Sequence, residues 1–303
     1  MAKIKKYKPY LEIFPVVLIL SFVFLVGIFG AFIQSLGYFP IIGMKELSFK
    51  FYMNIFENAN FLKSLAFTLY ITLTSSVVSV ILGILISRSI VELESGLNLK
   101  KNRIDIFYKI PIVVPHITVA LFAITFLSDS GIISRILYAI GFKNSQEFFS
   151  NLLFSPNGLG IVLSYIWKET PYVLLSTLAI LRKISIKHEM AARNLGASKI
   201  SAFCKITIPM LLPTISSTFT IIFAFSFGSY EIPILLGSTV PKALPVQAFI
   251  EYQNPMLTDR PSAMAMNMII IFFCLVFVLL FNYVIKYIIL GRNIKNLKIK
   301  NLK

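Results

Sequence analysis

Residues 264–285 read MAMNMIIIFFCLVFVLLFNYVI, a run of 22 residues without a charged side chain. The hydrocarbon core of a bilayer is about 30 Å thick and takes roughly 20 helical residues. Backbone N–H and C=O groups find no water in lipid, so a segment of this kind crosses as a helix that satisfies them internally. The stretch therefore predicts a transmembrane helix in an all-α membrane protein.

Five further apolar runs of similar length precede this one. They predict transmembrane helices at residues 13–33, 65–86, 106–127, 159–181 and 210–227. The composition agrees, because 57% of the residues are hydrophobic and only 14% are charged, against roughly 25% charged in an average soluble domain. The first run is too long for the h-region of a cleaved signal peptide. We therefore expect six transmembrane helices in a domain at 13–285, with tails at 1–12 and 286–303.

The positive charges are unevenly placed along the chain. The protein has 29 Lys and Arg against 13 Asp and Glu, a formal net charge of +16. The two tails and the loops 88–109 and 182–205 hold 21 of the basic residues, and the alternate loops hold seven. Because Lys and Arg are enriched in cytoplasmic loops, both termini are predicted to be cytoplasmic. This asymmetry accounts for the basic charge, so the expected partner is a lipid bilayer and no nucleic acid.

Motifs of catalysis and metal binding are missing. The sequence contains no GxxxxGK[ST], HExxH, GxSxG or paired CxxC pattern. Cys204 and Cys274 are 70 residues apart, without neighbours at ligand spacing. We therefore predict no catalytic residue, no metal site and no cofactor bound by this chain. His116 follows Pro115 and is expected to hydrogen-bond a carbonyl that the proline leaves free; a proton-relay role is the alternative.

The loop at 185–208, between the fourth and fifth predicted spans, reads as two short helices. Ser185 is placed to cap the first, and Gly196 to end it in a left-handed conformation. Ser198 is placed to cap the second helix, which is expected to stop before Pro209. The loop is thus predicted to carry helices on the cytoplasmic side of the membrane.

The first of these helices has a face of small residues. Ala191, Ala192 and Leu195 lie on one side of it at i, i+1 and i+4. Two alanines leave a flat, shallow surface that suits close docking against another protein. An amphipathic helix resting on the membrane surface would explain the same pattern, and these residues alone do not separate the two.

This loop resembles the EAA loop of binding-protein-dependent ABC importer permeases, whose core is Glu-Ala-Ala-x-x-x-Gly followed by an Ile-x-Leu-Pro-like end. Ala191, Ala192 and Gly196 match at the right spacing, as does the ending at Pro209. The resemblance implies a type I importer permease. It also implies that the loop is a coupling helix, which docks in a groove of a separate ATPase subunit.

The coupling residues implied by the resemblance are Glu189, Met190, Ala191, Ala192, Leu195, Gly196 and Ala197. One departure stands out, because Met190 occupies the position of the motif's glutamate. Glu189 is one residue earlier, about 100° away around the helix. We expect Glu189 to replace the missing contact at most in part.

The outer segments 230–237 and 259–265 resemble the polyamine-type branch, which includes iron, sulfate and molybdate relatives. The resemblance implies a bacterial cytoplasmic membrane protein with three kinds of partner: ATPase subunits that use ATP and Mg, a second permease of the same or a paralogous chain, and an extracytoplasmic substrate-binding protein. A polyamine such as spermidine or putrescine is the predicted solute. The alternatives are iron, sulfate or another small solute, an ion-coupled secondary transporter, and a membrane scaffold.

Four residues are candidates for the substrate path. Lys168 and Glu169 are the only charged residues deep in a predicted span, where burial is costly. Tyr230 and Glu231 follow the fifth span, and together with Glu169 they would supply the carboxylates and aromatic face that a polyamine needs. Local pairing or snorkelling of Lys168 and Glu169, and a capping role for Glu231, are the alternatives. The segment 228–261 is the predicted gate that contacts the receptor.

Overall fold

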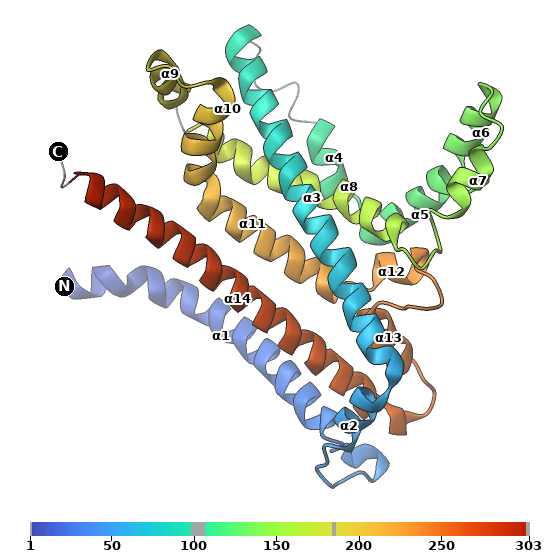
Figure 1. The fold of residues 1–303 in the computed structure, drawn as a ribbon. Helices are drawn as coiled ribbons and strands as arrows, with labels where there is room; N and C mark the ends of the chain where they lie inside the picture. The colour runs from blue at the N-terminus through green and yellow to red at the C-terminus, as the bar shows by residue number, and fades with distance from the viewer. Residues whose placement is uncertain (1, 98–106, 184–185, 301–303) are drawn as a thin grey trace. The chain divides into compact units, whose positions relative to one another are not determined.

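The computed structural model describes residues 2–97, 107–183 and 186–300, and Figure 1 follows its helices along the chain. Within these ranges all regular elements are helical, and one isolated bridge joins Phe39 and Met44. The chain divides into two compact units, one formed by residues 1–62 and 247–271 and the other by residues 63–246 and 272–303.

The first unit combines the N-terminal region with a later segment. It contains α1 (Ala2–Ser35), η1 (Pro40–Ile42), α2 (Lys50–Glu57), the start of α3 (Ala59–Leu97), the end of α13 (Leu244–Tyr252), η4 (Leu257–Asp259) and the start of α14 (Arg260–Lys300). The Ser35 and Tyr52 hydroxyls are 2.6 Å apart, which ties α2 to the end of α1. The Arg260 guanidinium lies 4.8 Å from the centroid of the Tyr252 ring, joining α14 to α13.

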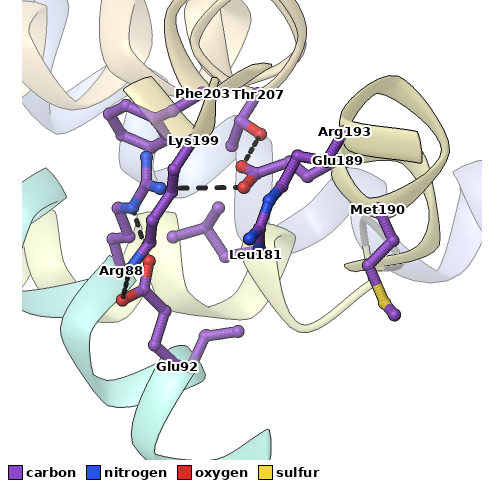
Figure 2. A pocket seen from close by; sticks show the side chains of 10 residues that line it. Arg88, Glu92, Leu181, Glu189, Met190, Arg193, Lys199, Phe203 and Thr207 are labelled. Atoms are coloured by element: carbon purple, nitrogen blue, oxygen red, sulfur yellow. Dashed lines mark hydrogen bonds and ion pairs between the residues drawn. The ribbon is translucent and has the colours of Figure 1, made fainter. Parts of the chain in front are cut away.

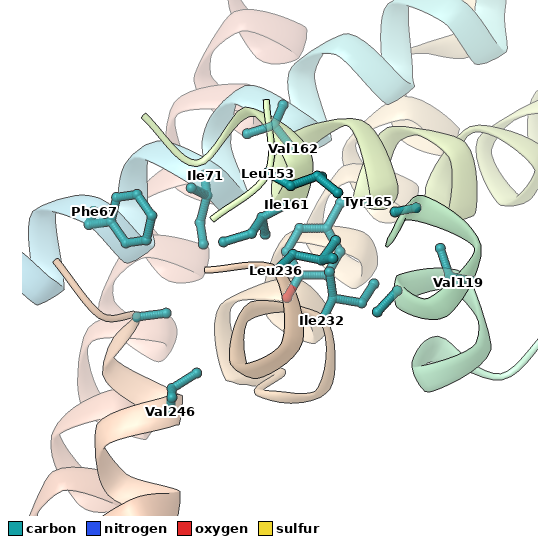
Figure 3. Close-up of a cluster of buried hydrophobic side chains, with 13 residues drawn as sticks. Phe67, Ile71, Val119, Leu153, Ile161, Val162, Tyr165, Ile232, Leu236 and Val246 are labelled. Carbon is teal, nitrogen blue, oxygen red and sulfur yellow. The ribbon is translucent and has the colours of Figure 1, made fainter. Parts of the chain in front are cut away.

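The second unit holds most of the chain. Besides the rest of α3, α13 and α14, it contains η2 (Phe107–Lys109), α4 (Ile110–Val113), α5 (His116–Leu127), α6 (Ile132–Ala139), α7 (Ser145–Ser150), α8 (Leu159–Leu181), α9 (Ile186–Asn194), α10 (Lys199–Ala202), η3 (Phe203–Thr207), α11 (Ile208–Gly228) and α12 (Glu231–Leu236). A cluster of buried apolar side chains joins α3, α5, α8 and α12, and includes Tyr165 of α8, Val119 of α5 and Ile232 of α12 (Figure 3). Helices α11 and α14 meet through stacked rings, with Phe223 and Phe277 centroids 4.1 Å apart.

Five helical segments of the described chain are long and apolar enough to cross a membrane. They are Glu12–Ser35, Ala59–Glu94, His116–Ala139, Lys199–Gly228 and Leu257–Tyr287. The predicted span at 159–181 forms α8 with those bounds but is not among the five, because Lys168 and Glu169 lower its hydropathy. Thirteen residues of α8 are buried, and it packs against α4, α5, α11 and α12. Protein rather than lipid therefore surrounds much of this helix.

The predicted span at 106–127 is not one continuous helix. Helix α4 ends at Val113, Val114 is extended (φ −67°, ψ 126°), and α5 begins at His116. The cause is Pro115, because a proline disfavours the helical conformation of the residue before it. The apolar candidate span consequently runs from His116 to Ala139, through α5 and α6.

The regions expected to be tails are helical where the structure describes them. Helix α1 begins at Ala2, within the predicted tail at 1–12. Helix α14 continues to Lys300, through most of the predicted tail at 286–303. Both transmembrane segments therefore extend as helices beyond their apolar runs.

Helices α3 and α8 meet along a line of residues four apart, here called the α3–α8 seam. Its pairs are Ser79 with Glu169, Gly83 with Val173, and Ser87 with Thr177. The numbers rise together on both helices, so α3 and α8 run parallel. A Cβ atom on Gly83 would lie 2.7 Å from Cβ of Val173, which shows how closely the helices approach. Small residues at such spacing are what allows close packing between membrane helices.

Candidate functional site

The first helix of the predicted coupling loop ends as its sequence indicates. Helix α9 is followed by Gly196 at φ +93°, a left-handed conformation. The Gly196 N–H donates to the Arg193 carbonyl at 2.9 Å, and the Ala197 N–H donates to the Ala192 carbonyl at 3.0 Å. These two bonds form a Schellman motif, which satisfies carbonyls at the helix end. The predicted role of Gly196 in ending the helix is confirmed.

The second helix begins as expected but does not end where predicted. The Ser198 hydroxyl accepts a hydrogen bond from the Ser201 N–H at 3.2 Å, which confirms the cap. Ser185, the predicted cap of the first helix, lies outside the described residues. Pro209 does not stop the second helix, because α10 continues through the π-helical η3 into α11. Pro209 sits in the first turn of α11, where the missing N–H of a proline is tolerated.

The loop helices meet the end of α3 around a cavity of about 350 Å³. Six of its lining residues, here called the coupling cluster, are Arg88 and Glu92 of α3, Glu189 of α9, Lys199 of α10, and Phe203 and Thr207 of η3. Figure 2 shows these side chains converging from the separate helices. The cluster therefore joins the loop to α3, although Arg88 and Glu92 lie more than 90 residues before the other four members in the sequence.

Arg88 is the central cation of the coupling cluster. Its Nε donates to Glu92 Oε1 at 2.8 Å, and its terminal nitrogen lies 3.7 Å from Glu189 Oε2. The guanidinium carbon is 3.7 Å from the centre of the Phe203 ring, a cation–π distance. Lys199 Nζ donates to the other oxygen of Glu92 at 2.8 Å. One arginine thus contacts three elements while only 16% of its side chain is exposed.

Glu189 faces the cluster and not the outer surface of α9. The Thr207 hydroxyl donates to its carboxylate, whose other oxygen lies on the Arg88 side (Figure 2). Met190, in contrast, is 54% exposed and points away from the cluster. Glu189 is therefore not positioned to present a carboxylate at the place of the motif's glutamate.

The other predicted coupling residues form the outer surface of the loop. Ala191, Leu195 and Gly196 are exposed, and Leu195 reaches 90% exposure, while Ala192 and Ala197 are half-buried. An exposed leucine among small residues is a surface that another protein can cover. The loop thus has an inner face of charges that contact α3 and an outer face of small and apolar side chains.

Lys168 bridges the break before α5. Its Nζ donates to the carbonyls of Pro111 at 2.8 Å and Ile112 at 2.9 Å, and also to the carbonyl of Val114. The Pro111 carbonyl is the one that Pro115 leaves without an intrahelical donor, because proline has no N–H. The ammonium group of α8 thus satisfies backbone carbonyls at the helix break.

Glu169 turns to a different side of α8. Its carboxylate accepts hydrogen bonds from the hydroxyls of Ser79 on α3, at 3.1 Å, and Ser226 on α11. The residue is buried. Lys168 and Glu169 therefore do not pair with each other among the described contacts, and each connects α8 to other helices.

Glu231 lies beside a histidine rather than beside Lys168 or Glu169. Its Oε2 is 3.7 Å from Nδ1 of His116 on α5, and the His116 ring is 4.8 Å from that of Phe225. The expected bond from His116 to a freed carbonyl is absent from the described contacts, because Lys168 takes that carbonyl. Tyr230 and Glu231 are both about 37% exposed. These two side chains are partly accessible, as is Lys168, whereas Glu169 is buried.

Comparison with known proteins identifies the family of this chain. Residues 98–289 match the family described as "binding-protein-dependent transport system inner membrane component". This chain belongs to that family. The matched region contains α4 to α12, the predicted coupling loop and the four predicted path residues, and it makes the protein a multi-pass membrane permease of an importer.

The curated relatives of the permease have named substrates. It is 25% identical over 216 residues to a probable sulfate transport system permease protein cysT of Prototheca wickerhamii, covering 71% of this chain and 80% of the relative. It is 20% identical to the sulfate transport system permease protein CysT of Escherichia coli, covering 76% and 79%. It is 26% identical to the ferric transport system permease protein FbpB of Actinobacillus pleuropneumoniae, covering 59% of this chain and 25% of that protein.

A solved structure confirms the fold. The permease superposes with a TM-score of 0.73 and 20% identity on a bacterial ABC transporter involved in the import of the polysaccharide alginate, covering 95% of this chain and 98% of that one. At this level of identity the likeness concerns the fold alone. None of these relatives is described as a polyamine permease, so the polyamine prediction is less well supported than its sulfate and iron alternatives.

Sequence reasoning missed most of the permease's coupling cluster. Arg88 and Glu92 fall in a predicted loop, whereas α3 continues to Leu97. Their spacing of four, with an arginine and a glutamate, is the pattern of an ion pair on a helix surface and was the available signal. Nothing local relates them to Lys199 or Thr207, which are more than 100 residues away in the sequence.

The predicted gate segment at 228–261 of the permease is shared by the two units. In one unit, Ile232 and Leu236 of α12 are fully buried against α5 and α8. In the other, Asn254 Nδ2 donates to Asp259 Oδ2 at 2.7 Å. Burial, and then the negative charge of Asp259, raise the pKa of the Glu251 carboxyl. The segment thus forms short helices, and α12 is held by packing against other helices of its unit.

Proposed function

We propose that this permease forms the substrate path of an ATP-driven importer and that α9 transmits the action of ATP to it. The proposal rests on the geometry of the predicted coupling loop, in a chain that belongs to this family. Its Schellman end at Gly196 presents Met190, Ala191 and Leu195 on an exposed surface, while its inner face is bonded to α3. A docked ATPase would cover the outer face and move the loop from there.

We propose six membrane crossings, with both termini and the coupling loop in the cytoplasm. Five segments meet the criteria of length and hydropathy, and α8 would be the sixth, shielded by its neighbours. The parallel seam supports this order, because the second and fourth spans of an alternating topology begin on the same side. The 21 basic residues in the tails and alternate loops support the cytoplasmic side. The bacterial cytoplasmic membrane is the proposed location.

The proposed assembly combines this chain with three kinds of partner. Two ATPase subunits would hold ATP and Mg, so that this chain needs no cofactor of its own. A second permease, the same or paralogous, would complete the path. An extracytoplasmic substrate-binding protein would deliver the solute to the segment 228–261. A solved alginate transporter of the same fold is in complex with a substrate-bound periplasmic protein, which makes this arrangement reasonable.

For the substrate we propose sulfate, with ferric iron as the alternative. The relatives support this choice, since several are sulfate permeases and one is a ferric permease. Of the four path candidates, Tyr230 would line the path for either solute, whereas the Glu231 carboxylate would repel sulfate and favour the ferric alternative. Lys168 and Glu169 would hold its walls, because their polar groups are occupied by backbone carbonyls and by serine hydroxyls.

Co-purification with the ATPase subunits tests the coupling proposal. We expect Gly196→Trp and Ala192→Arg to abolish recovery of the ATPase with the tagged permease, because both changes disrupt the outer face of the loop. Gly141→Trp is the matched control. Gly141, which follows α6, is also left-handed (φ +103°), and a Cβ atom added to it would have no neighbouring atom within 4 Å. Undiminished ATPase recovery with both loop variants would contradict the proposal.

Solute uptake tests the substrate. Proteoliposomes containing the complete importer, its binding protein and internal ATP would be given labelled sulfate, ferric iron or spermidine in separate experiments. We expect ATP-dependent accumulation of sulfate. Accumulation of iron alone would select the alternative, and accumulation of spermidine alone would restore the polyamine prediction.

A further inference from the structure

The coupling segment, residues 186–207, is attached to the membrane helices in two ways. It is covalently continuous with α11 through η3. It is also bonded non-covalently to α3 through the coupling cluster. The second attachment decides which helices follow the loop when it moves, and the family match alone does not specify it.

Arg88 is the residue on which this second attachment depends. It contacts Glu189 in α9 and Phe203 in η3, and it is held in place by Glu92 one turn along α3. The planar guanidinium allows one side chain to make ion pairs at its edge and a cation–π contact on its face. Its low exposure also reduces the screening by water that weakens surface ion pairs.

The seam extends the connection beyond Arg88. Helix α8 is locked to α3 at Gly83 and Val173, where a methyl group does not fit. Arg182 near the end of α8 also forms an ion pair with Glu94 of α3. Anything that holds α9 to α3 therefore holds it to α8, which carries Lys168 at the helix break and Glu169 beside α11.

The π-helical turn gives the segment a different relation to α11. Residues 203–207 form wide i→i+5 turns, and such turns occur at functional sites and where helices change direction. Pro209 lies two residues after the end of η3 and supplies no N–H to the ladder. The covalent link to α11 thus contains a π-helical turn at which it can bend, whereas contacts of Arg88 stabilise the non-covalent link to α3.

We propose that Arg88 is a positioning residue that makes α9 and α3 move as one body. This inference rests on the proposed coupling function of α9 and adds to it the helix that receives the motion. A displacement of the loop by the ATPase would then be passed to the α3–α8 pair, and the bending would occur in η3.

Distances between spin labels test this proposal. The labels would be placed at Asn194→Cys on α9 and Tyr70→Cys on α3, both exposed positions, after Cys204→Ser and Cys274→Ala. Tyr70 lies 18 residues before Arg88, about 27 Å along the helix, which suits pulsed electron paramagnetic resonance. The distribution would be recorded for the isolated permease, and for the importer without nucleotide and trapped with ATP and vanadate.

We expect one narrow distance that is the same in all three samples. Arg88→Gln should broaden or shift it by more than the wild-type width, and Glu189→Gln should have a similar effect, because it removes the α9 partner without changing α3. The double variant should add little to either single change. Arg193→Gln is the control, since Arg193 lines the same cavity but its side chain has no bonded partner among the described residues, and it should leave the distance unchanged.

Several results would overturn the proposal. These are a wild-type distance that changes on vanadate trapping, an Arg88→Gln distance equal to that of the wild type, or additive effects of the two changes. If Arg88→Gln does not yield folded protein, Glu189→Gln and Arg88→Lys provide the same comparison. The isolated permease reports on the connection between α9 and α3 without any ATPase. Failure of ATPase recovery would therefore count against the proposed coupling function, and not against the proposal that α9 and α3 move as one body.

Discussion

The α3–α8 seam and the coupling cluster both hold α3 to another part of the second unit, by different chemistry. The seam uses glycine, serine and threonine, with one carboxylate that two hydroxyls satisfy. The cluster uses an arginine, a lysine, two carboxylates and an aromatic ring around a cavity. One interface has no space for a methyl group, and the other encloses about 350 Å³.

The environment explains the difference. Within a membrane, charges are costly and close backbone approach replaces the hydrophobic effect as the source of attraction between helices. Near water, charged side chains can be placed at little cost and form ion pairs. We infer that the seam holds two helices together by close backbone approach, whereas the cluster holds the loop to α3 by ion pairs and a cation–π contact of the shielded Arg88. The following changes test this contrast, beginning with the largest expected effect.

Gly83→Leu should have the largest effect, because it attacks the seam at its tightest point. The new side chain would collide with Val173 and with the Leu174 backbone nitrogen, 3.0 Å from the Cβ position. Overpacking typically costs about 1–3 kcal/mol, and separating the helices would also break the two hydrogen bonds on either side. We expect little folded protein, measured as monodisperse yield and melting temperature in detergent.

Gly30→Leu is the control for this change. Gly30 lies in α1, and no atom is within 4 Å of its Cβ position. It should give near-normal yield. If Gly83→Leu and Gly30→Leu behave alike, the seam is not as rigid as its geometry indicates.

Glu169→Leu should have the next largest effect. It leaves the hydroxyls of Ser79 and Ser226 without an acceptor inside the helix packing. Each buried polar group left unpaired costs about 1–3 kcal/mol. Glu169→Gln keeps the shape, an acceptor oxygen and a donor, and should lose much less. Thermal unfolding of both variants gives the comparison, and equal melting temperatures for Leu and Gln would show that hydrogen bonds do not stabilise this part of the seam.

Gly196→Ala should have a moderate and local effect. A left-handed conformation costs a residue with a Cβ roughly 1–2 kcal/mol, yet no neighbouring atom obstructs the side chain. We expect weaker recovery of the ATPase with an almost unchanged melting temperature. Gly196→Asn should restore recovery, because asparagine tolerates this conformation. If Asn is as poor as Ala, contact with the glycine surface rather than backbone conformation is what matters.

The sequence predicted features that depend on neighbouring residues. The ends of α9 and α10 follow from Gly196 and Ser198, which act within a few residues. Apolar runs located α1, α3, α11 and α14, because length and hydropathy are local properties. The family resemblance, carried by two alanines and a glycine at fixed spacing, was confirmed by the family match.

Features that depend on distant residues were not predictable in this way. That Lys168 bonds the carbonyls before α5 requires α4 and α8 to be adjacent, although they are more than 45 residues apart in sequence. The same holds for Glu169 with its two serines. Gly83 reads as one small residue in an apolar run, and only the approach of Val173 gives it a role. Charge within a predicted span marked Lys168 and Glu169 as candidates, but their bonding partners are visible only in the fold.

Lys199→Gln should have the smallest effect of all. Its ammonium is 2.8 Å from Glu92, but the two side chains are 56% and 41% exposed, and exposed ion pairs contribute about 0.2–1 kcal/mol. We expect a small loss of stability that disappears at high salt, measured by melting temperature at two ionic strengths. Arg88 lies beside the same glutamate but is shielded and contacts three elements, so its replacement should matter more and be less sensitive to salt. Equal, salt-dependent effects of the two changes would mean that the whole cluster is a weak surface network, and the contrast with the seam would then be one of strength as well as of chemistry.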